Sequence, residues 1–392
     1  MKVLMYCQHV LGIGHLVRSA EIARALSQEA DVTFVSGGAP VDGFPFPPGV
    51  RLTQLPPIQT DDEFGALETC GCAQDIEDLQ DLRRQQLLAL FNEFAPQVLI
   101  IELFPFGRKR FGFELLPLLE RARQRDGETL VVCSLRDILV EKADRTKHES
   151  RVCRIVNKYF DLILVHGDPA LHTLGESFHR VQDLRCNLLY TGFVQQANTG
   201  STAVMERSEP TIIASIGSGR YRQGQFLLES VIRAAALLEA KIPHRFCVFA
   251  GPFIPDEVYT HLQRVGREAR NVEIQRYSPG LPGYLHRADL SISMGGYNSI
   301  MNLLAAGVRS LVYPYTSNND QEQHIRARKL ESLGIVELLH PEMLAPEVLA
   351  SRIEEMLAKT PARLNFDMNG AANTARILHS LRQSRVSGVA VK

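Results

Sequence analysis

Polar side chains gather between Tyr297 and Gln323, just after a pair of glycines, Gly295 and Gly296. The glycines precede an expected helix that Asn298 or Ser299 can cap, and a helix start offers free backbone N–H groups and partial positive charge to a phosphate. The next loop holds Asp320, Gln321 and Gln323. An ordinary strand–helix–strand crossover would explain the glycines alone, but fixed amides and carboxylates in this number suit a ligand rich in hydroxyl groups.

A second set of chemically active residues follows other expected strands. In a doubly wound parallel sheet, ligand groups lie just past the carboxyl ends of the strands. This rule selects His9, Gly14, His15, Glu102, Arg136, Asp137, His166 and Asp168. A histidine titrates near neutral pH and suits a general base, although His15 could also only stabilise its turn. For Glu102 and the Arg136-Asp137 pair, a structural role is as consistent with the sequence as a catalytic one.

The first glycine-rich turn does not fit a dinucleotide site. The sequence Gly12-Ile-Gly14 lacks the third glycine of that motif, and no acidic residue ends the second strand, Asp31–Ser36. A nicotinamide-dependent enzyme is therefore disfavoured.

Length and composition limit the remaining classes. A chain of 392 residues exceeds the usual size of a single core, so two domains are expected. The net charge of −1 offers no general attraction to nucleic acid. No stretch suits a membrane span or signal peptide, so a cytoplasmic protein is expected. The 7 cysteines indicate reduced thiols, and Cys70-Gly-Cys72 lacks further ligands for a metal.

Strands alternate with helix-periodic segments along the whole chain, which predicts two doubly wound, Rossmann-like parallel-sheet domains. We place the first domain at residues 1–195, a polar linker at 196–209, the second domain at 210–364 and a C-terminal helical segment at 365–392, which could pack back on the first domain. The expected strands are Lys2–Cys7, Asp31–Ser36, Val50–Leu55, Gln97–Ile101, Thr129–Cys133, Leu162–Val165 and Leu188–Tyr190, followed by Thr211–Ile216, Arg245–Ala250, Val272–Gln275, Asp289–Ser293 and Ser310–Tyr313.

Several motifs together resemble the GT-B glycosyltransferases, and family 28 in particular. The resemblance rests on Gly12-Ile-Gly14-His15, Thr191-Gly192, Gly217-Ser218-Gly219, Gly295-Gly296-Tyr-Asn-Ser and Asp320-Gln-Glu-Gln323. Family 28 is typified by the lipid II-forming N-acetylglucosaminyltransferase. Its poorly characterised bacterial relatives also resemble this chain at Gly12–Arg18, Leu135–Leu139 and His166–Pro169.

The resemblance implies transfer of a sugar from a nucleotide donor, usually a UDP-sugar, to an acceptor hydroxyl, with inversion and without a required metal or cofactor. The donor would bind the second domain through Gly217, Ser218, Gly219, Gly295, Gly296, Tyr297, Asn298, Ser299, Asn302, Asp320, Gln321 and Gln323. A small-molecule or lipid-linked acceptor would meet Gly14, Arg18, Arg136 and His166 of the first domain, where His15 would be the base with Glu102 or Asp137 orienting its ring. Asn302 stands where the family usually has a ribose-binding glutamate.

Two other functions remain open on this architecture: a nucleotide-sugar 2-epimerase and a catalytically idle sugar-nucleotide binder. The epimerase needs denser carboxylates and basic groups around the sugar than the amide-rich loop Thr316–Gln323 supplies. The segment Leu103–Phe113 interleaves aromatic residues with Arg108-Lys109-Arg110 and could touch a membrane surface or an anionic acceptor, although a packed loop with a solvated basic tip explains it better.

Overall fold

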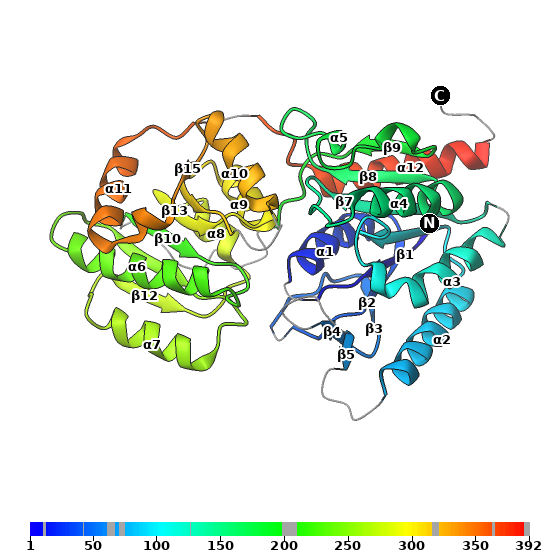
Figure 1. The fold of residues 1–392 in the computed structure, drawn as a ribbon, viewed down its shortest axis with the longest axis horizontal. Coiled ribbons are helices and arrows are strands. Elements are labelled where there is room, and N and C mark those ends of the chain that lie inside the picture. The colour runs from blue at the N-terminus through cyan, green and yellow to red at the C-terminus, as the bar shows by residue number, and fades with distance from the viewer. Residues whose placement is uncertain are drawn as a thin grey trace. The chain divides into compact units, whose positions relative to one another are not determined.

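The structure is a computed structural model that describes residues 1–10, 13–41, 43–60, 67–69, 75–125, 127–197, 210–315, 321–362 and 365–387. The chain divides into two compact units (Figure 1). Unit 1 comprises Met1–Gln195 and Phe366–Lys392, and unit 2 comprises Gln196–Asn365. Each unit contains its own parallel sheet, as a doubly wound fold requires, and the predicted fold class is confirmed.

The sheet of unit 1 has the order β3-β2-β1-β6-β7-β8-β9, and every neighbouring pair is parallel. Its strands are β1 (Lys2–Cys7), β2 (Asp31–Ser36), β3 (Val50–Gln54), β6 (Val98–Glu102), β7 (Leu130–Arg136), β8 (Leu162–His166) and β9 (Asn187–Tyr190). The strand order reverses between β1 and β6. Ligands of such sheets bind at this switch point, outside the carboxyl ends of the strands.

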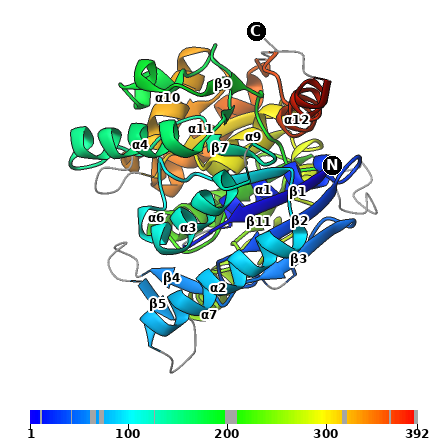
Figure 2. The same ribbon diagram turned by 90° about the vertical axis from the view of Figure 1, so that its right-hand side faces the viewer.

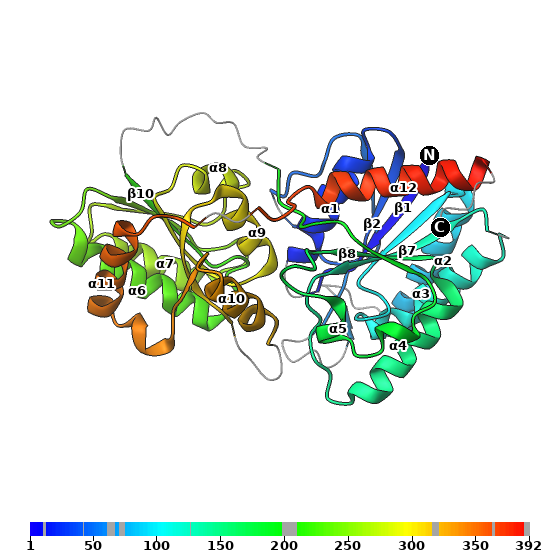
Figure 3. The same ribbon diagram turned by 90° about the horizontal axis from the view of Figure 1, so that it is seen from above.

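Helices cover both faces of this sheet. They are α1 (Gly14–Leu26), α2 (Ile76–Phe94), α3 (Gly112–Arg123), α4 (Arg145–Tyr159), α5 (Leu174–Ser177) and α12 (Gly370–Ser387), with short 3-10 turns η1 (Lys109–Phe111) and η2 (Val181–Asp183). Figure 3 shows α12 alongside α1 on one face and α3, α4 and α5 on the other. A small antiparallel pair, β4 (Ile58–Thr60) with β5 (Leu67–Thr69), follows β3, and Figure 2 shows β5 beside α2.

The sheet of unit 2 has the order β12-β11-β10-β13-β14-β15 and is also parallel, so its order reverses between β10 and β13. Its strands are β10 (Thr211–Ser215), β11 (Arg245–Phe249), β12 (Val272–Gln275), β13 (Leu290–Met294), β14 (Arg309–Tyr313) and β15 (Glu337–Leu338). Its helices are α6 (Arg222–Leu238), α7 (Asp256–Gly266), α8 (Leu281–Leu285), α9 (Tyr297–Ala306), α10 (Glu322–Ser332) and α11 (Pro346–Ala358), with the 3-10 turn η3 (Pro341–Leu344).

Local details of the prediction are confirmed in part. Gly307 ends α9 in the left-handed conformation at φ 62°, as a helix-terminating glycine does. The predicted caps Asn298 and Ser299 are wrong, because α9 begins at Tyr297 behind Gly296, which has extended backbone and supplies no side-chain cap. Gly12, the pair Cys70 and Cys72, and the loop Thr316–Asp320 lie outside the described residues.

In the part of the chain that is described, no helix combines the length and the apolar character that crossing a bilayer requires.

Candidate active site

His15 and Glu102 meet at the switch point of unit 1. Because β1 and β6 are neighbours, the start of α1 lies beside the last residue of β6, and Nδ1 of His15 donates to Oε1 of Glu102 over 2.6 Å. Arg18, one helical turn further along α1, donates from Nη2 to the same oxygen over 2.5 Å. The Glu102 side chain is 0% exposed, whereas that of His15 is 18% exposed. The carboxylate is thus held from two sides and the imidazole keeps one accessible edge.

The charges of this cluster are set by burial. Burial lowers the pKa of His15 to about 4, and Arg108 and Arg18 lower it as well, against the raising effect of Glu102. Burial alone would raise the pKa of Glu102, but His15, Arg18 and Arg108 lower it to about 2. At neutral pH His15 is therefore neutral beside an ionised Glu102. With the ring proton on Nδ1, atom Nε2 is left as an acceptor, which is the state a general base needs.

The backbone is strained directly after Glu102, at Leu103. Leu103 has φ 64°, which is an outlier for a bulky residue. Its backbone N–H donates to Ser134 O over 2.8 Å, and its carbonyl accepts from Gly107 N over 2.9 Å. Such strain persists only where surrounding contacts enforce it, and it clusters at functional sites. The sequence did not reveal it.

Of the two carboxylates predicted to orient His15, Glu102 is the one that bonds its ring, and Asp137 lies in the loop after β7. Oδ1 of Asp137 accepts from the backbone N–H of Ile138 over 2.9 Å, and its side chain is buried. Gly167 packs directly against it, since an added Cβ there would lie 2.8 Å from Cβ of Asp137. Asp137 thus organises the loop after β7.

His166 is a buried structural residue. It is 0% exposed, with Nε2 bonded to Ser134 Oγ over 2.7 Å and Nδ1 bonded to Thr191 Oγ1 over 2.9 Å. Burial, with Arg18, lowers the pKa of His166 to about 3, so the ring stays neutral. Both ring nitrogens are thus engaged inside unit 1, and the contact of His166 with an acceptor stays a prediction.

The remaining acceptor-side residues take different places. Gly14 is the first residue of α1, and Arg18 is buried against Glu102, so Arg18 holds the carboxylate instead of facing solvent. Arg136 ends β7, in register with His166 of β8, and is half-buried. The strand is longer than predicted and includes Arg136 within the sheet.

In unit 2, the loops that follow β10 and β11 are packed backbone to backbone. Gly219 has φ 84° and Gly251 has φ 93°. A Cβ added to Gly219 would lie 2.5 Å from Ala250 O, and one added to Gly251 would lie 2.5 Å from Gly219 N. Phe253 N donates to Ser218 O over 2.9 Å. The loop Gly217–Gly219 is therefore backed by Gly251 and Phe253. Sequence reasoning missed this contact, although Gly251 directly follows the predicted strand Arg245–Ala250.

The loops after β13 and β14 meet at Gly295. A Cβ added there would lie 3.4 Å from Pro314 Cα and 3.5 Å from Gln323 Cβ. Gln323 accepts through Oε1 from Tyr315 N over 3.0 Å, and the Tyr315 ring lies 4.3 Å from that of Tyr221, just after Gly219. Loops from β10, β13 and β14 thus form one surface at the carboxyl edge of the unit 2 sheet.

The first turns of α9 and α10 are locked together. The guanidinium of Arg326 lies 5.3 Å from the centre of the Tyr297 ring and donates to Glu322 over 2.7 Å, which confirms the predicted pairing of Glu322 with Arg326. Asn298 and Ser299 lie in the first turn of α9. Gln321 occupies the N-cap position of α10, but its side chain makes no capping hydrogen bond. Asp320 lies outside the described residues.

Asn302 and Arg220 add two features to this surface. Asn302 is only 6% exposed, and its Oδ1 accepts from Gln196 N over 3.4 Å, so its amide is engaged by the first residue of unit 2. Arg220 is exposed beside Gly219, with its guanidinium 5.1 Å from the Phe253 ring. Arg220 was not predicted from the sequence, although a cation directly after a glycine loop is a signal for phosphate binding.

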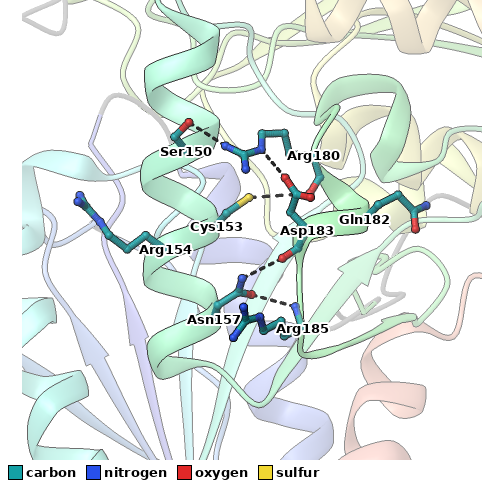
Figure 4. A pocket seen from close by; sticks show the side chains of 8 residues that line it. All are labelled: Ser150, Cys153, Arg154, Asn157, Arg180, Gln182, Asp183 and Arg185. Atoms are coloured by element: carbon teal, nitrogen blue, oxygen red, sulfur yellow. Dashed lines mark hydrogen bonds and ion pairs between the residues drawn. The ribbon is translucent and has the colours of Figure 1, made fainter.

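A surface pocket of about 510 Å³ on α4 is separate from these clusters (Figure 4). Its lining side chains largely bond to one another: Arg180 donates to Ser150 over 2.8 Å, and Asn157 donates to Asp183 O over 2.8 Å. Arg154 extends away from the Arg180–Asp183 segment in Figure 4. Asn157 lies near the end of α4, which leads to the amino end of β8 and so away from the carboxyl edge. We interpret the pocket as a packing gap between α4 and the η2 segment and not as a ligand site.

Comparisons with known proteins agree with this arrangement. Residues 222–381 match the glycosyltransferase family 28 C-terminal domain. An uncharacterized glycosyltransferase from Methanosarcina acetivorans is 22% identical over 80% of this chain and 81% of its own length. A UDP-N-acetylglucosamine--N-acetylmuramyl-(pentapeptide) pyrophosphoryl-undecaprenol N-acetylglucosamine transferase from Synechococcus sp. is 31% identical over 38% of each chain. Together, these similarities support a family 28-like GT-B glycosyltransferase.

Solved structures show the GT-B fold across nearly the whole chain. Acinetobacter baumannii MurG has a TM-score of 0.56 at 13% identity, covering 98% of this chain and 99% of that one. A putative UDP-N-acetylglucosamine 2-epimerase from Listeria monocytogenes has a TM-score of 0.64 at 12% identity, covering 99% and 97%. At these identities the likeness concerns the fold alone. The span of the family 28 domain begins at α6, directly after the Gly217–Gly219 loop, and includes Gly295, Gly296 and Gln323.

Proposed function

We propose that this glycosyltransferase is an inverting, metal-independent enzyme. It moves a sugar from a nucleotide-sugar donor, with UDP as the expected nucleotide, to an acceptor hydroxyl. The observation that carries the proposal is the neutral His15 bonded to an ionised Glu102 at the switch point of unit 1. A buried carboxylate that accepts from one imidazole nitrogen fixes the tautomer and stabilises the imidazolium once the other nitrogen takes a proton.

The reaction assigns a task to each group. Nε2 of His15 takes the proton of the acceptor hydroxyl as its oxygen forms a bond to the anomeric carbon of the donor sugar. The bond from that carbon to the diphosphate oxygen breaks, and the nucleoside diphosphate leaves with the electron pair. Backbone N–H groups at the start of α9 and in the Gly217–Gly219 loop, together with Arg220, would offset the charge on the leaving diphosphate.

The donor is assigned to unit 2 because its loops suit a phosphorylated, hydroxyl-rich ligand. Gly251 holds the Gly217–Gly219 loop from behind, and Gln323 keeps Nε2 of its side-chain amide as a donor group while its Oε1 binds Tyr315 N. Asp320 and Gln323 stay proposed ligands of the sugar, and Gln321 stays a proposed donor contact. The acceptor is assigned to unit 1, where Asp137 stays a proposed catalytic residue and also organises the loop after β7.

The acceptor is either a small molecule or lipid-linked, and peripheral membrane contact belongs to the second case. Lys109 and Arg110 are exposed, whereas Phe104, Phe106 and Phe111 are buried in the core. Aromatic insertion into a bilayer is therefore not part of the proposal, and any contact would rest on the basic residues alone.

A panel of nucleotide-sugars tests the proposal against its alternatives. Binding is measured by calorimetry, and the products are followed by NMR with and without candidate acceptors. A glycosylated product with inverted anomeric configuration supports the proposal. An isomerised donor formed without acceptor indicates the 2-epimerase, which the fold likeness to a putative epimerase keeps as the second candidate. Binding without turnover indicates an idle sugar-nucleotide binder.

A further inference from the structure

Arg83 on α2 is fully buried and uses its whole guanidinium to join loops of unit 1. Nη1 donates to Gly37 O over 2.8 Å and to Pro56 O over 2.7 Å, so it binds the loops after β2 and after β3. Nη2 donates to Gln8 Oε1 over 2.8 Å, directly after β1. One side chain thus connects the carboxyl ends of neighbouring strands β1, β2 and β3.

The charge of Arg83 is neutralised inside the same cluster. Nε and Nη2 donate to the two carboxylate oxygens of Glu114 on α3, over 3.0 Å and 2.6 Å. Burial, followed by the charge of Glu114, holds the pKa of Tyr6 well above its usual value, so the phenol stays protonated and donates to Glu114. Arg83, Glu114 and Tyr6 are each 0% exposed. A buried ion pair with its other hydrogen-bonding groups satisfied is costly to break by removing one partner.

The three loops are also interlocked with one another. Gln8 Nε2 donates to His9 O over 3.0 Å and to Ile58 O over 3.1 Å. A Cβ added to Gly37 would lie only 2.1 Å from Gln8 Oε1, and Ile58 N donates to Gly37 O over 3.4 Å. We call Gln8–His9, Gly37–Gly38 and Pro56–Ile58 the loop platform. It adjoins the switch point where His15 meets Glu102, because β1 is the neighbour of β6.

We propose that Arg83 is a positioning residue that holds the loop platform as one rigid surface against which the acceptor binds. The guanidinium is suited to this role because its planar fork serves the carboxylate and the loop carbonyls at the same time, which a lysine ammonium cannot do. A purely structural ion pair would need Glu114 but not the carbonyls of Gly37 and Pro56. The kinetic part of this inference rests on the proposed function, whereas the rigidity of the platform does not.

The test compares Arg83→Lys with Glu114→Gln in the full-length protein. Arg83→Lys keeps the charge but loses the fork, whereas Glu114→Gln removes the charge and keeps the bonds of Arg83 to Gly37 O and Pro56 O. Amide hydrogen exchange is followed at Gly37, Leu55 and Ile58, whose N–H groups bond between the loops. Gln97 N and Thr191 N, bonded to β1 and β8 of the same unit, are the reference amides.

We expect Arg83→Lys to raise exchange at the platform amides by ~10- to 100-fold relative to the reference amides, since each bond from a charged donor is strong. Glu114→Gln should lower the melting temperature without that selective rise. Arg123→Lys is the matched control, because Arg123 also bonds a carboxylate and a carbonyl, Asp161 and Tyr159 O, but away from the platform. Equal opening of the platform in both Arg83→Lys and Glu114→Gln, or none in Arg83→Lys, would overturn the inference.

The kinetic arm uses any acceptor that gives turnover. Arg83→Lys should raise the KM for the acceptor by ~10-fold or more and leave the KM for the donor unchanged, because a loosened platform must be ordered on binding. Selective exchange with an unchanged KM for the acceptor would show that the acceptor does not bind the loop platform. Should no acceptor be turned over by the unaltered protein, the proposed function fails, and the exchange result still decides whether Arg83 holds the loops. If Arg83→Lys does not fold, the exchange of Glu114→Gln decides. Selective opening of the platform in Glu114→Gln would refute the role of the bonds from Arg83 to the carbonyls. A platform that stays closed in Glu114→Gln would support that role.

Discussion

Replacing His15 by alanine removes the only group that we assign as base. Loss of a general base typically lowers the rate ~10²- to 10⁴-fold, which corresponds to about 3 to 5 kcal/mol of transition-state stabilisation. We expect kcat to fall by this factor and donor affinity, measured by calorimetry, to stay nearly intact, because the proposed donor contacts come from unit 2. Near-normal turnover would place the base elsewhere, with Glu102 the next candidate. Loss of donor binding in step with activity would make His15 a donor ligand.

The pH profile of the unaltered enzyme provides a second readout of the same residue. His15 must be neutral to accept a proton, and its pKa is about 4. The acid limb of kcat/KM should therefore lie near pH 4, well below the value of about 6.5 for a free histidine. Glu102→Gln removes the group that raises this pKa, so the limb should move to still lower pH while kcat falls. A limb near pH 6.5 would refute the buried geometry.

The same pKa predicts how stability depends on pH. A histidine whose folded pKa lies below its unfolded value binds its proton more readily when the chain unfolds. His15 therefore leaves stability intact above pH 6.5 and reduces it as the pH falls from 6.5 to 4, by at most about 3 kcal/mol. His15→Ala should lose part of this acid sensitivity in denaturant titrations at pH 7 and pH 4.5, whereas an unchanged difference between the two pH values would count against it.

Three further predictions concern the donor side. Turnover should persist in a chelator, because helix starts and Arg220 stabilise the leaving diphosphate; activity lost in chelator and restored by Mg²⁺ or Mn²⁺ would argue otherwise. A folded fragment from about residue 210 to residue 360 should bind UDP by itself, since the proposed contacts are contiguous there, and a fragment that binds no nucleoside diphosphate would refute the assignment. Gly251→Ala should weaken donor binding by ~10-fold or more, because its Cβ would meet Gly219 N at 2.5 Å. Gly334→Ala, at φ 72° with no atom within 4 Å of the added Cβ, controls for backbone strain alone and should leave binding unchanged.

The sequence predicted the strands well because the central strands of a parallel sheet are buried on both faces and read as continuous apolar runs. Both β1 and β10 illustrate this, as all residues of β10 are buried. The pairing of His15 with Glu102 followed from one topological rule, since side chains at the carboxyl ends of adjacent strands meet at the same edge. The choice between Glu102 and Asp137 needed the structure, because both follow neighbouring strands.

Contacts between residues remote in sequence were not predictable in this way. Arg83 lies 75 positions from Gln8 and 31 from Glu114, and on a predicted amphipathic helix it looks like any solvent-facing arginine. Gly251 follows a predicted strand, but its contact with Gly219 depends on the packing of two loops. The hydrogen bonds of His166 were equally unpredictable from the sequence. A polar residue at a strand end suggested a ligand contact, whereas Ser134 and Thr191 had already engaged both ring nitrogens.

Asn302→Glu examines the position where this chain departs from the family. A carboxylate at a site only 6% exposed must find hydrogen-bond donors or lose stability. If residue 302 meets the ribose, the two ribose hydroxyls would supply these donors in the complex. The Gln196 N–H, which now donates to Asn302 Oδ1, would supply another. We therefore expect the variant to melt at a lower temperature without ligand, to bind UDP more tightly, and to gain more thermal stability from UDP than the unaltered protein does. Asn302→Asp is the control for added charge, because aspartate carries the same charge as glutamate on a side chain one methylene shorter. Unchanged UDP affinity in Asn302→Glu would separate Asn302 from the ribose and leave its bond to Gln196 as its role.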